Sequence, residues 1–243
     1  MKKITAIALS LALSASLTAA SLATGSTAVH ASASKERVQL AGHATYYGEV
    51  KNGVPHGHGT IKWGDGKQYS GDFSDGKRTG TGKYMNEYVS EGHKIKVVYS
   101  GAWKNDKMEG KGTLTHKVTD EEGRVVSHQI QTGIFKNHLF KSGYDVIHAV
   151  ADPDYSFTYK NGNETLYIMG HNKDMKASWK TGKIFMAKYQ KGSVSKTYTF
   201  FPGDTKAEER KNAAALKYLQ SIQPRINPHL EQFERLSKQL PLK

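Results

Sequence analysis

The sequence predicts a mainly β protein: a single-layer sheet of stacked β-hairpins, extended by further strands and followed by two C-terminal α-helices. The first observation is a short pattern that recurs three times between Tyr46 and Gly112. The second is the alternation of bulky and polar residues around turn signals between Tyr155 and Phe201, which is typical of strands. The third is a change to helical spacing after Pro202.

Each copy of the repeat opens with tyrosine, has glycine two residues later and a large apolar residue four residues later, and closes with paired glycines. Residues i, i+2 and i+4 of a strand share one face, so the central glycine leaves room there for a neighbouring ring. The copies consist of Tyr46, Gly48, Val50, Gly57 and Gly59; of Tyr69, Gly71, Phe73, Gly80 and Gly82; and of Tyr99, Gly101, Trp103, Gly110 and Gly112.

Turn signals divide the repeats into hairpins. Asn52-Gly53, Asp65-Gly66 and Asp75-Gly76 supply residues that tolerate positive φ, as tight hairpin turns require. A hairpin of about twenty residues cannot bury a face alone, so we expect roughly three or more to stack.

A fourth copy, at residues 131–144, is degenerate. It opens with Gln131 instead of tyrosine, keeps Gly133 and Phe135, and has Ser142 and Tyr144 at the positions of the paired glycines. We therefore predict repeats over residues 46–68, 69–98, 99–130 and 131–144, within a repeat region that covers 46–144.

The pattern YxGxW, with NG or DG turns, HGxG and a 23-residue period, resembles the MORN repeat family. The resemblance is good over residues 46–115 and poor over 131–143. It implies an elongated sheet of stacked hairpins that serves as a binding or assembly scaffold, with protein contacts, self-association or membrane-proximal placement. It also implies that catalysis, where present, belongs to a separate attached domain. Val50, Asp106 and the stretched second and third repeats depart from the family pattern.

Residues 145–203 are predicted to add four or five antiparallel strands. Asn161-Gly162 and Thr181-Gly182 supply the turns between them. In this reading the strands continue the repeat sheet or close it.

Residues 204–243 are predicted to form two amphipathic helices. Thr205 and Glu208 make a capping box for the first, which Pro224 is expected to end, and Asn227 with Pro228 is expected to begin the second. The apolar stripes consist of Leu216, Leu219 and Ile222, and of Leu230, Phe233, Leu236 and Leu240. We expect these stripes to pack against the same domain, with a partner or membrane surface as the alternative.

Residues 1–33 are predicted to be a secretory signal peptide, because a basic start and an apolar run end in Ala31, Ser32 and Ala33. Residues 34–45 then lead into the repeats. We expect an extracytoplasmic protein, secreted or associated with the cell envelope, with no membrane span once the signal is removed. The sequence has no cysteine, so packing and stacking must stabilise the fold without disulfides.

Catalytic, metal and cofactor sites are not predicted, and the chain is not expected to be an enzyme. Residues 76–83 resemble a phosphate-binding loop, but the glycine spacing is wrong and Tyr84 follows where serine or threonine is needed. His56 and His58 offer two imidazoles, fewer than the three or four ligands that zinc requires. The less favoured alternative is a hydrolase with a site in residues 145–243, built from Asp145, Asp152, Asp154 or Glu164.

The net charge of +13 favours an anionic partner. The densest basic segment runs from Lys173 to Lys196, where seven lysines accompany one acid. The candidate residues for binding an anionic lipid or wall polymer are Lys173, Lys176, Trp179, Lys180, Lys183, Lys188, Tyr189, Lys191 and Lys196. In this hypothesis the lysines contact phosphates or carboxylates and the rings contact apolar or sugar surface; a merely soluble lysine face is the alternative.

Two functions therefore remain open. The favoured one is a non-catalytic scaffold that binds another protein or the cell envelope, with self-association left open. The other is electrostatic binding of an anionic polymer or bilayer through the basic segment. Sequence-specific recognition of nucleic acid is disfavoured by the preference for lysine over arginine and by the export signal.

Overall fold

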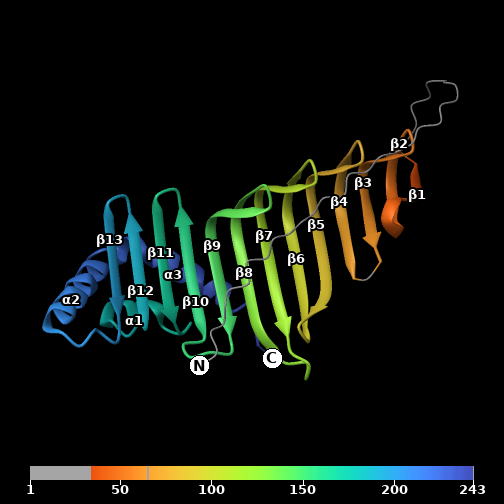
Figure 1. Ribbon diagram of the computed structural model, residues 1–243. Helices are drawn as coiled ribbons and strands as arrows, with labels where there is room; N and C mark the ends of the chain where they lie inside the picture. Colours follow the sequence, from red (N-terminus) through yellow and green to blue (C-terminus); the bar gives the residue numbers. More distant parts are fainter. Residues whose placement is uncertain (1–33, 65, 243) are drawn as a thin grey trace.

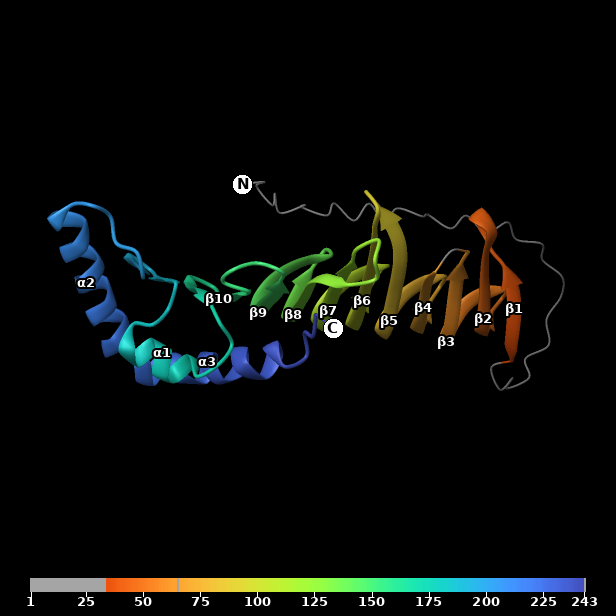
Figure 2. The ribbon, with the colours of Figure 1, turned by 90° about the horizontal axis from the view of Figure 1, so that it is seen from below.

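The computed structural model describes residues 34–64 and 66–242 (Figure 1). Thirteen strands form one open sheet, in which each strand pairs antiparallel with its neighbours in the sequence. Three helices lie against one face of the second half of the sheet, two of them at the C-terminal end (Figures 1 and 2). The predicted fold class is confirmed. The predicted signal peptide, residues 1–33, and the turn residue Asp65 lie outside the described residues.

The repeat region forms long strands and the second half shorter ones. The strands are β1 (Lys35–Gln39), β2 (Ala44–Lys51), β3 (Val54–Trp63), β4 (Lys67–Ser74), β5 (Lys77–Ser90), β6 (His93–Lys104), β7 (Lys107–Thr119), β8 (Val125–Lys136), β9 (Leu139–Ala149), β10 (Tyr155–Asn161), β11 (Glu164–Gly170), β12 (Met186–Lys191) and β13 (Val194–Thr199). The helices are α1 (Met175–Thr181), α2 (Lys206–Ser221) and α3 (Gln223–Ser237), and a 3-10 turn, η1 (Ala41–His43), precedes β2.

Six two-residue turns lie at the same end of the strands, at the top of Figure 1, and we call the first four, between β2 and β9, the hairpin tips. The hairpin tips join β2 to β3, β4 to β5, β6 to β7 and β8 to β9. Both residues of every tip have positive φ: Asn52 and Gly53, Asp75 and Gly76, Asn105 and Asp106, Asn137 and His138. The turns predicted at Asn52-Gly53 and Asp75-Gly76 are confirmed, and Asp106 adopts the left-handed conformation that aspartate tolerates.

Each repeat tyrosine lies flat over a glycine of the next strand. The Tyr69 ring covers Gly82, and its hydroxyl donates a hydrogen bond to the main-chain oxygen of Asp72 at 3.1 Å. Tyr46 over Gly59 and Tyr99 over Gly112 repeat the arrangement. Burial raises the pKa of the Tyr46 and Tyr99 hydroxyls to about 12, so they remain protonated donors at neutral pH.

In the second and third repeats, the large aromatic residue four positions after the tyrosine joins neighbouring tyrosines edge to face. The Phe73 ring lies 5.2 Å from both Tyr46 and Tyr69, and the Trp103 ring lies 5.1 Å from Tyr69 and 5.3 Å from Tyr99. Such contacts contribute beyond area burial, by about 0.5–1.5 kcal/mol each. A continuous row of rings therefore holds the repeats together on one side of the sheet, which we call the aromatic face.

The fourth hairpin keeps a pair of glycines that face each other across β8 and β9. Gly133 of β8 pairs with Gly143 of β9, as Gly101 pairs with Gly112 in the third repeat. The prediction that both closing glycines are lost, at Ser142 and Tyr144, was wrong for the second of them: this hairpin is one residue shorter, so Gly143 takes the place of Gly112. The first closing glycine is absent, because Lys141 stands two residues before Gly143. The close approach of the two backbones still requires glycine there.

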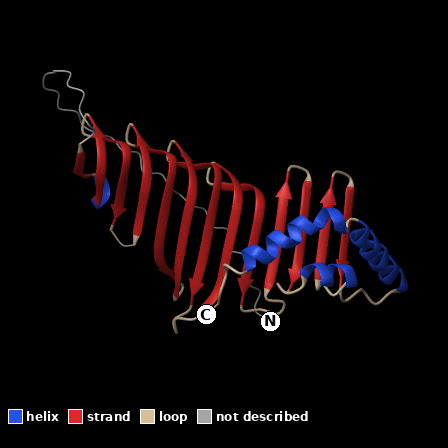
Figure 3. Cartoon of the chain, turned by 180° about the vertical axis from the view of Figure 1, so that it is seen from behind, coloured by secondary structure: helices blue, strands red, loops and turns tan. Residues whose placement is uncertain are grey.

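The apolar layer changes sides in the second half. Register continues the row of Tyr99 through Leu114 to the polar Gln131 and Asp145, so this row of the aromatic face becomes polar beyond β7. Nearer the hairpin tips, Phe135 of β8 and Phe140 of β9 still belong to the aromatic cluster. The opposite side then becomes apolar, and the helices cover it in Figure 3. This helix face carries Ile130, Val146, Phe157, Leu166 and Ile168, packed against Leu219, Leu230 and Phe233.

The segment around Trp179 was predicted to be a strand, and this was wrong. It forms α1, in which Met175 and Trp179 lie one helical turn apart and are both buried. Gly182, predicted as a turn between strands, instead caps the helix with φ 72°, and its N–H donates to the oxygens of Ser178 and Trp179.

The capping box at Thr205 and Glu208 is confirmed, and so is the burial of the helical stripes. The predicted start of the last helix at Asn227 was wrong. α3 begins at Gln223, because Pro224 occupies its first turn, where a missing N–H costs nothing, and Pro228 lies inside the helix. Among the described residues, no helix has the length and apolarity that a membrane crossing requires.

Candidate binding surfaces

The two rings of the predicted basic site are part of the core. Trp179 and Tyr189 are each 1% exposed. The Trp179 indole donates to the main-chain oxygen of Leu219 at 2.9 Å, and the Tyr189 hydroxyl donates to the Glu164 carboxylate at 2.8 Å. The prediction that these rings contact a partner was wrong, because they face the helices and not solvent.

The lysines of the same segment are scattered. Lys176 pairs with Glu231, Lys191 pairs with Glu164 at 3.2 Å, and the Lys196 ammonium lies 5.6 Å from the centre of the Tyr218 ring. The other four are exposed: Lys173, Lys180, Lys183 and Lys188. They come from a loop, from α1, from a second loop and from β12, so the segment does not form one basic surface.

An apolar cleft of about 670 Å³ lies beside α1, at the ends of the strands that are opposite the hairpin tips. Phe185, Phe200 and Phe201 line it, with 37%, 51% and 67% of their surfaces exposed. The Phe201 ring contacts Phe200 and Phe185 edge-on, at centroid distances of 5.2 and 5.9 Å. Lys173 and Lys183 lie in the same lining. Sequence reasoning missed this site because its residues come from separate loops.

A second hollow, of about 420 Å³, lies on the aromatic face where that face becomes polar. Both oxygens of the Asp145 carboxylate accept amide hydrogen bonds, from Gln129 at 2.8 Å and from Gln131 at 2.9 Å. Lys160 donates to the main-chain oxygen of Phe140 at 3.0 Å at the rim. Burial raises the pKa of the Asp145 carboxyl, and the two amides and Lys160 only partly oppose this effect.

We expect Asp145 to titrate above the ordinary range of aspartate. Because its folded-state pKa exceeds its unfolded-state pKa, the folded state binds the proton more tightly. The stability that this group contributes is therefore present at low pH and declines as the pH rises from the ordinary aspartate pKa through the raised one. A carbon-detected NMR titration would measure this; a pKa at or below the ordinary value would contradict it.

The acids considered for a hydrolase do not come together. Asp145 lies on the aromatic face, and Asp152 lines the cleft beside α1. Asp154 lies 2.8 Å from His171, and Glu164 pairs with Lys191 and with Arg225 on the helix face. Asp145, Asp154 and Glu164 thus each have partners of their own, and the four acids do not form one site.

The histidines singled out in the sequence each lie near a separate carboxylate. His56 is 3.8 Å from Asp75, and His58 is 3.2 Å from Asp72. Across residues 34–64 and 66–242, no three histidine or acidic side chains are grouped so that they could hold a metal ion.

Comparison with known families agrees with the stacked hairpins. The family described as MORN repeat matches residues 46–68, 69–85 and 99–117. The chain carries three MORN repeats. The matched segments begin at Tyr46, Tyr69 and Tyr99, the three tyrosines that cover glycines.

Several known proteins are similar to part of this chain, and the similarity covers only part of each of them. Human Alsin is 38% identical over 104 residues, which are 41% of this chain and 6% of Alsin. MORN repeat-containing protein 3 of Xenopus laevis is 46% identical over 69 residues, 28% of this chain and 29% of that protein. Human ALS2 C-terminal-like protein is 33% identical over 116 residues, 48% of this chain and 11% of that protein. The aligned segments thus span less than a third of each relative.

Proposed function

We propose that the chain is an exported, non-catalytic MORN-repeat scaffold that binds a partner protein at the cell envelope. The observation that carries the proposal is the apolar cleft with its exposed phenylalanines, Phe185, Phe200 and Phe201. The repeats support it as a rigid frame, because hydrogen-bonded tyrosines and edge-to-face rings fix each hairpin to the next.

Exposed rings around a hollow are the surface that a protein partner most readily uses. Aromatic side chains dominate interface energies when they enter a desolvated pocket, and their exposure in the free protein is unfavourable. The cleft offers both halves of such a contact: a concavity for a partner's apolar side chain, and the projecting Phe201 ring for a pocket on the partner. Lys173 and Lys183 would place an acidic group of the partner at the rim.

Replacing both Phe200 and Phe201 with serine is expected to weaken partner capture strongly. The loss should be about 2 kcal/mol or more, roughly thirtyfold in affinity, because the two rings are proposed as the anchors. The measurement is affinity capture of envelope and medium proteins by the mature protein, followed by quantitative mass spectrometry. The matched control replaces Tyr47 and Val89 with serine, since these are 54% and 72% exposed and lie far from the cleft in the sequence and the sheet. Equal capture by both variants would contradict the proposal.

An anionic bilayer is the alternative occupant, because lysines and apolar rings line the same cleft. Binding that depends on Lys173 and Lys183 should collapse as salt screens the lipid surface, within a Debye length of about 10 Å at 0.1 M ionic strength. Co-sedimentation with anionic vesicles at low and high salt tests this. Salt-insensitive sedimentation would count against an electrostatic contribution.

A further inference from the structure

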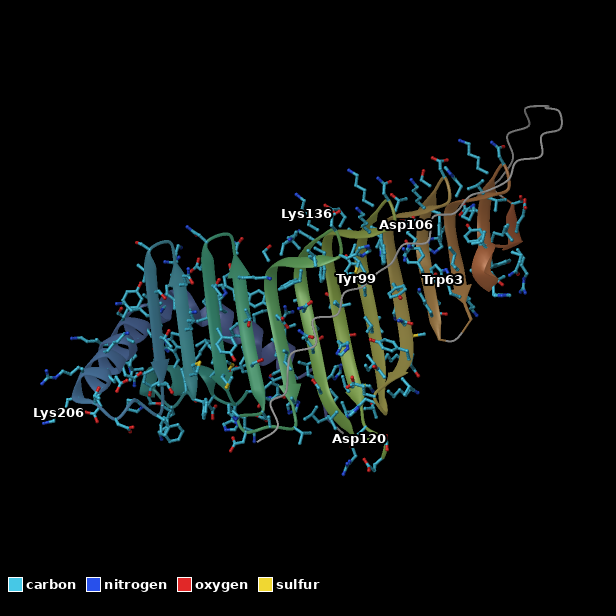
Figure 4. The ribbon with its side chains drawn as sticks, in the orientation of Figure 1. Trp63, Tyr99, Asp106, Asp120, Lys136 and Lys206 are labelled. Atoms are coloured by element: carbon cyan, nitrogen blue, oxygen red, sulfur yellow. The ribbon has the colours of Figure 1, made fainter. Side chains whose placement is uncertain are left out.

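The four hairpin tips present a row of exposed lysines. One or two lysines flank the central turn residues in every tip: Lys51 in the first, Lys77 in the second, Lys104 and Lys107 in the third, and Lys136 in the fourth. Figure 4 labels Lys136 and Asp106 along this side of the sheet. Lysines that are far apart in the sequence are thus gathered along one line.

The tips are joined to one another by main-chain hydrogen bonds. The Gly76 N–H donates to the Pro55 oxygen at 2.9 Å, the Asp106 N–H to the Arg78 oxygen at 3.0 Å, and the His138 N–H to the Met108 oxygen at 3.1 Å. The same bond therefore links each tip to the next. The backbone that carries the lysines is fixed, and only the side chains must be ordered when a ligand binds.

The lysines also lie on one face of the sheet, the face opposite the aromatic face. Lys104 follows the buried Trp103, and Lys136 follows the buried Phe135, so alternation along the strand places both opposite the aromatic face. Lys51 follows Val50 in the same way, and Lys104 and Lys107 pair across the turn. A ligand that lies on this face of the sheet can therefore contact the lysines of successive tips without passing to the aromatic face.

The carboxylates near the row already have partners. Glu49, Asp72 and Glu109 accept main-chain N–H groups of His58, Thr81 and Asn137, at 3.2, 2.7 and 2.9 Å. Asp75, in the second tip, faces His56. Within the part of the chain that the structure describes, none of the five tip lysines forms a salt bridge, so their charge is available to a ligand.

We propose that the row of tip lysines binds a linear polyanion whose charges are phosphates. Neighbouring strands lie about 4.8 Å apart, so successive tips recur about every 10 Å and the row is about 29 Å long. A flexible phosphate chain can follow such a line and release its counterions at each tip. A bilayer is the poorer fit, because beside the four tips, all within the described residues, Leu139 is the only exposed large apolar side chain. The proposal is independent of the protein partner at the cleft.

The test is binding of long-chain inorganic polyphosphate to the mature protein, with tripolyphosphate as the short probe. Long chains should bind much more tightly than tripolyphosphate, which can reach one tip. Four phosphate contacts predict a slope of log affinity against log salt of about −2.8, so a fourfold rise in salt should weaken binding about 50-fold. Replacing Lys51, Lys77, Lys104 and Lys136 with glutamine should reduce affinity at low salt about tenfold or more and remove most of this slope.

A matched control separates the row from net charge. It replaces Lys180, Lys188, Lys211 and Lys217 with glutamine, since these are also exposed and the change in charge is the same. The control should keep wild-type affinity, and unchanged circular dichroism should show that both variants are folded. The proposal is overturned if the two variants lose affinity equally, if the tip variant binds like the wild type, or if anionic vesicles bind the protein and polyphosphate does not.

Discussion

Replacing Gly82 with alanine is expected to destabilise the protein by about 3 kcal/mol, the upper end of what overpacking costs. A β-carbon at this position would enter the Tyr69 ring, which lies directly on the glycine. The ring cannot move aside, because Phe73 and Trp103 contact it on both sides and its hydroxyl is bound to Asp72. Urea unfolding followed by circular dichroism would measure the loss.

Replacing Gly123 with alanine is the control. Gly123 has φ 83°, so alanine there costs backbone strain, but no atom lies within contact distance of the added carbon. The expected loss is about 1 kcal/mol. A Gly82 variant that loses no more than this would show that the tyrosine does not depend on the bare glycine.

The repeat region could be predicted because its physical signals are local. Alternation fixes which residues share a face, and Asn52-Gly53 or Asp75-Gly76 fixes where the chain reverses. The register of the fourth hairpin could not be read in the same way. One residue is missing between Gly133 and Gly143, and only the pairing of the two strands reveals which glycine meets which.

In the second half, the prediction of secondary structure failed at a short segment whose residues fit both the spacing of a helix and the alternation of a strand. Met175 and Trp179 are spaced for one helical turn, yet the lysines between and after them also fit alternation in a strand. Gly182, read as a hairpin turn, was the available signal for a helix end. The lysines of the segment are divided among loops, α1, β12 and β13, so they do not gather on one surface although they are close together in the sequence.

The candidate sites depended on contacts that a sequence does not display. Phe185 and Phe200 are brought together by the pairing of β12 with β13, where the Phe200 N–H donates to the Phe185 oxygen at 2.9 Å. The tip lysines did have a sequence signal, since lysine flanks the turn in each hairpin. It is visible only when the copies are aligned on their turns, because the copies are 23 and 30 residues apart.

Replacing Asp106 with asparagine is expected to destabilise the protein by about 3 kcal/mol, as breaking one side of a buried ion pair does. The Arg78 side chain is buried, with its guanidinium 4.7 Å from the centre of the Trp103 ring and 5.6 Å from that of Tyr69. Its Nε donates to the Asp106 carboxylate at 2.9 Å. Asparagine keeps the shape and tolerates the positive φ of this tip, so the lost charge is the main change.

Removing the arginine instead should cost less. Replacing Arg78 with methionine leaves no buried charge, and the thioether can pack among the same rings, so we expect a loss of about 1 kcal/mol. In the double variant the asparagine should add little to that loss, because the charge it would strand is already gone. Urea unfolding of the wild type, both single variants and the double variant measures the coupling. Additive losses would mean that the rings alone stabilise the guanidinium and that Asp106 serves the turn.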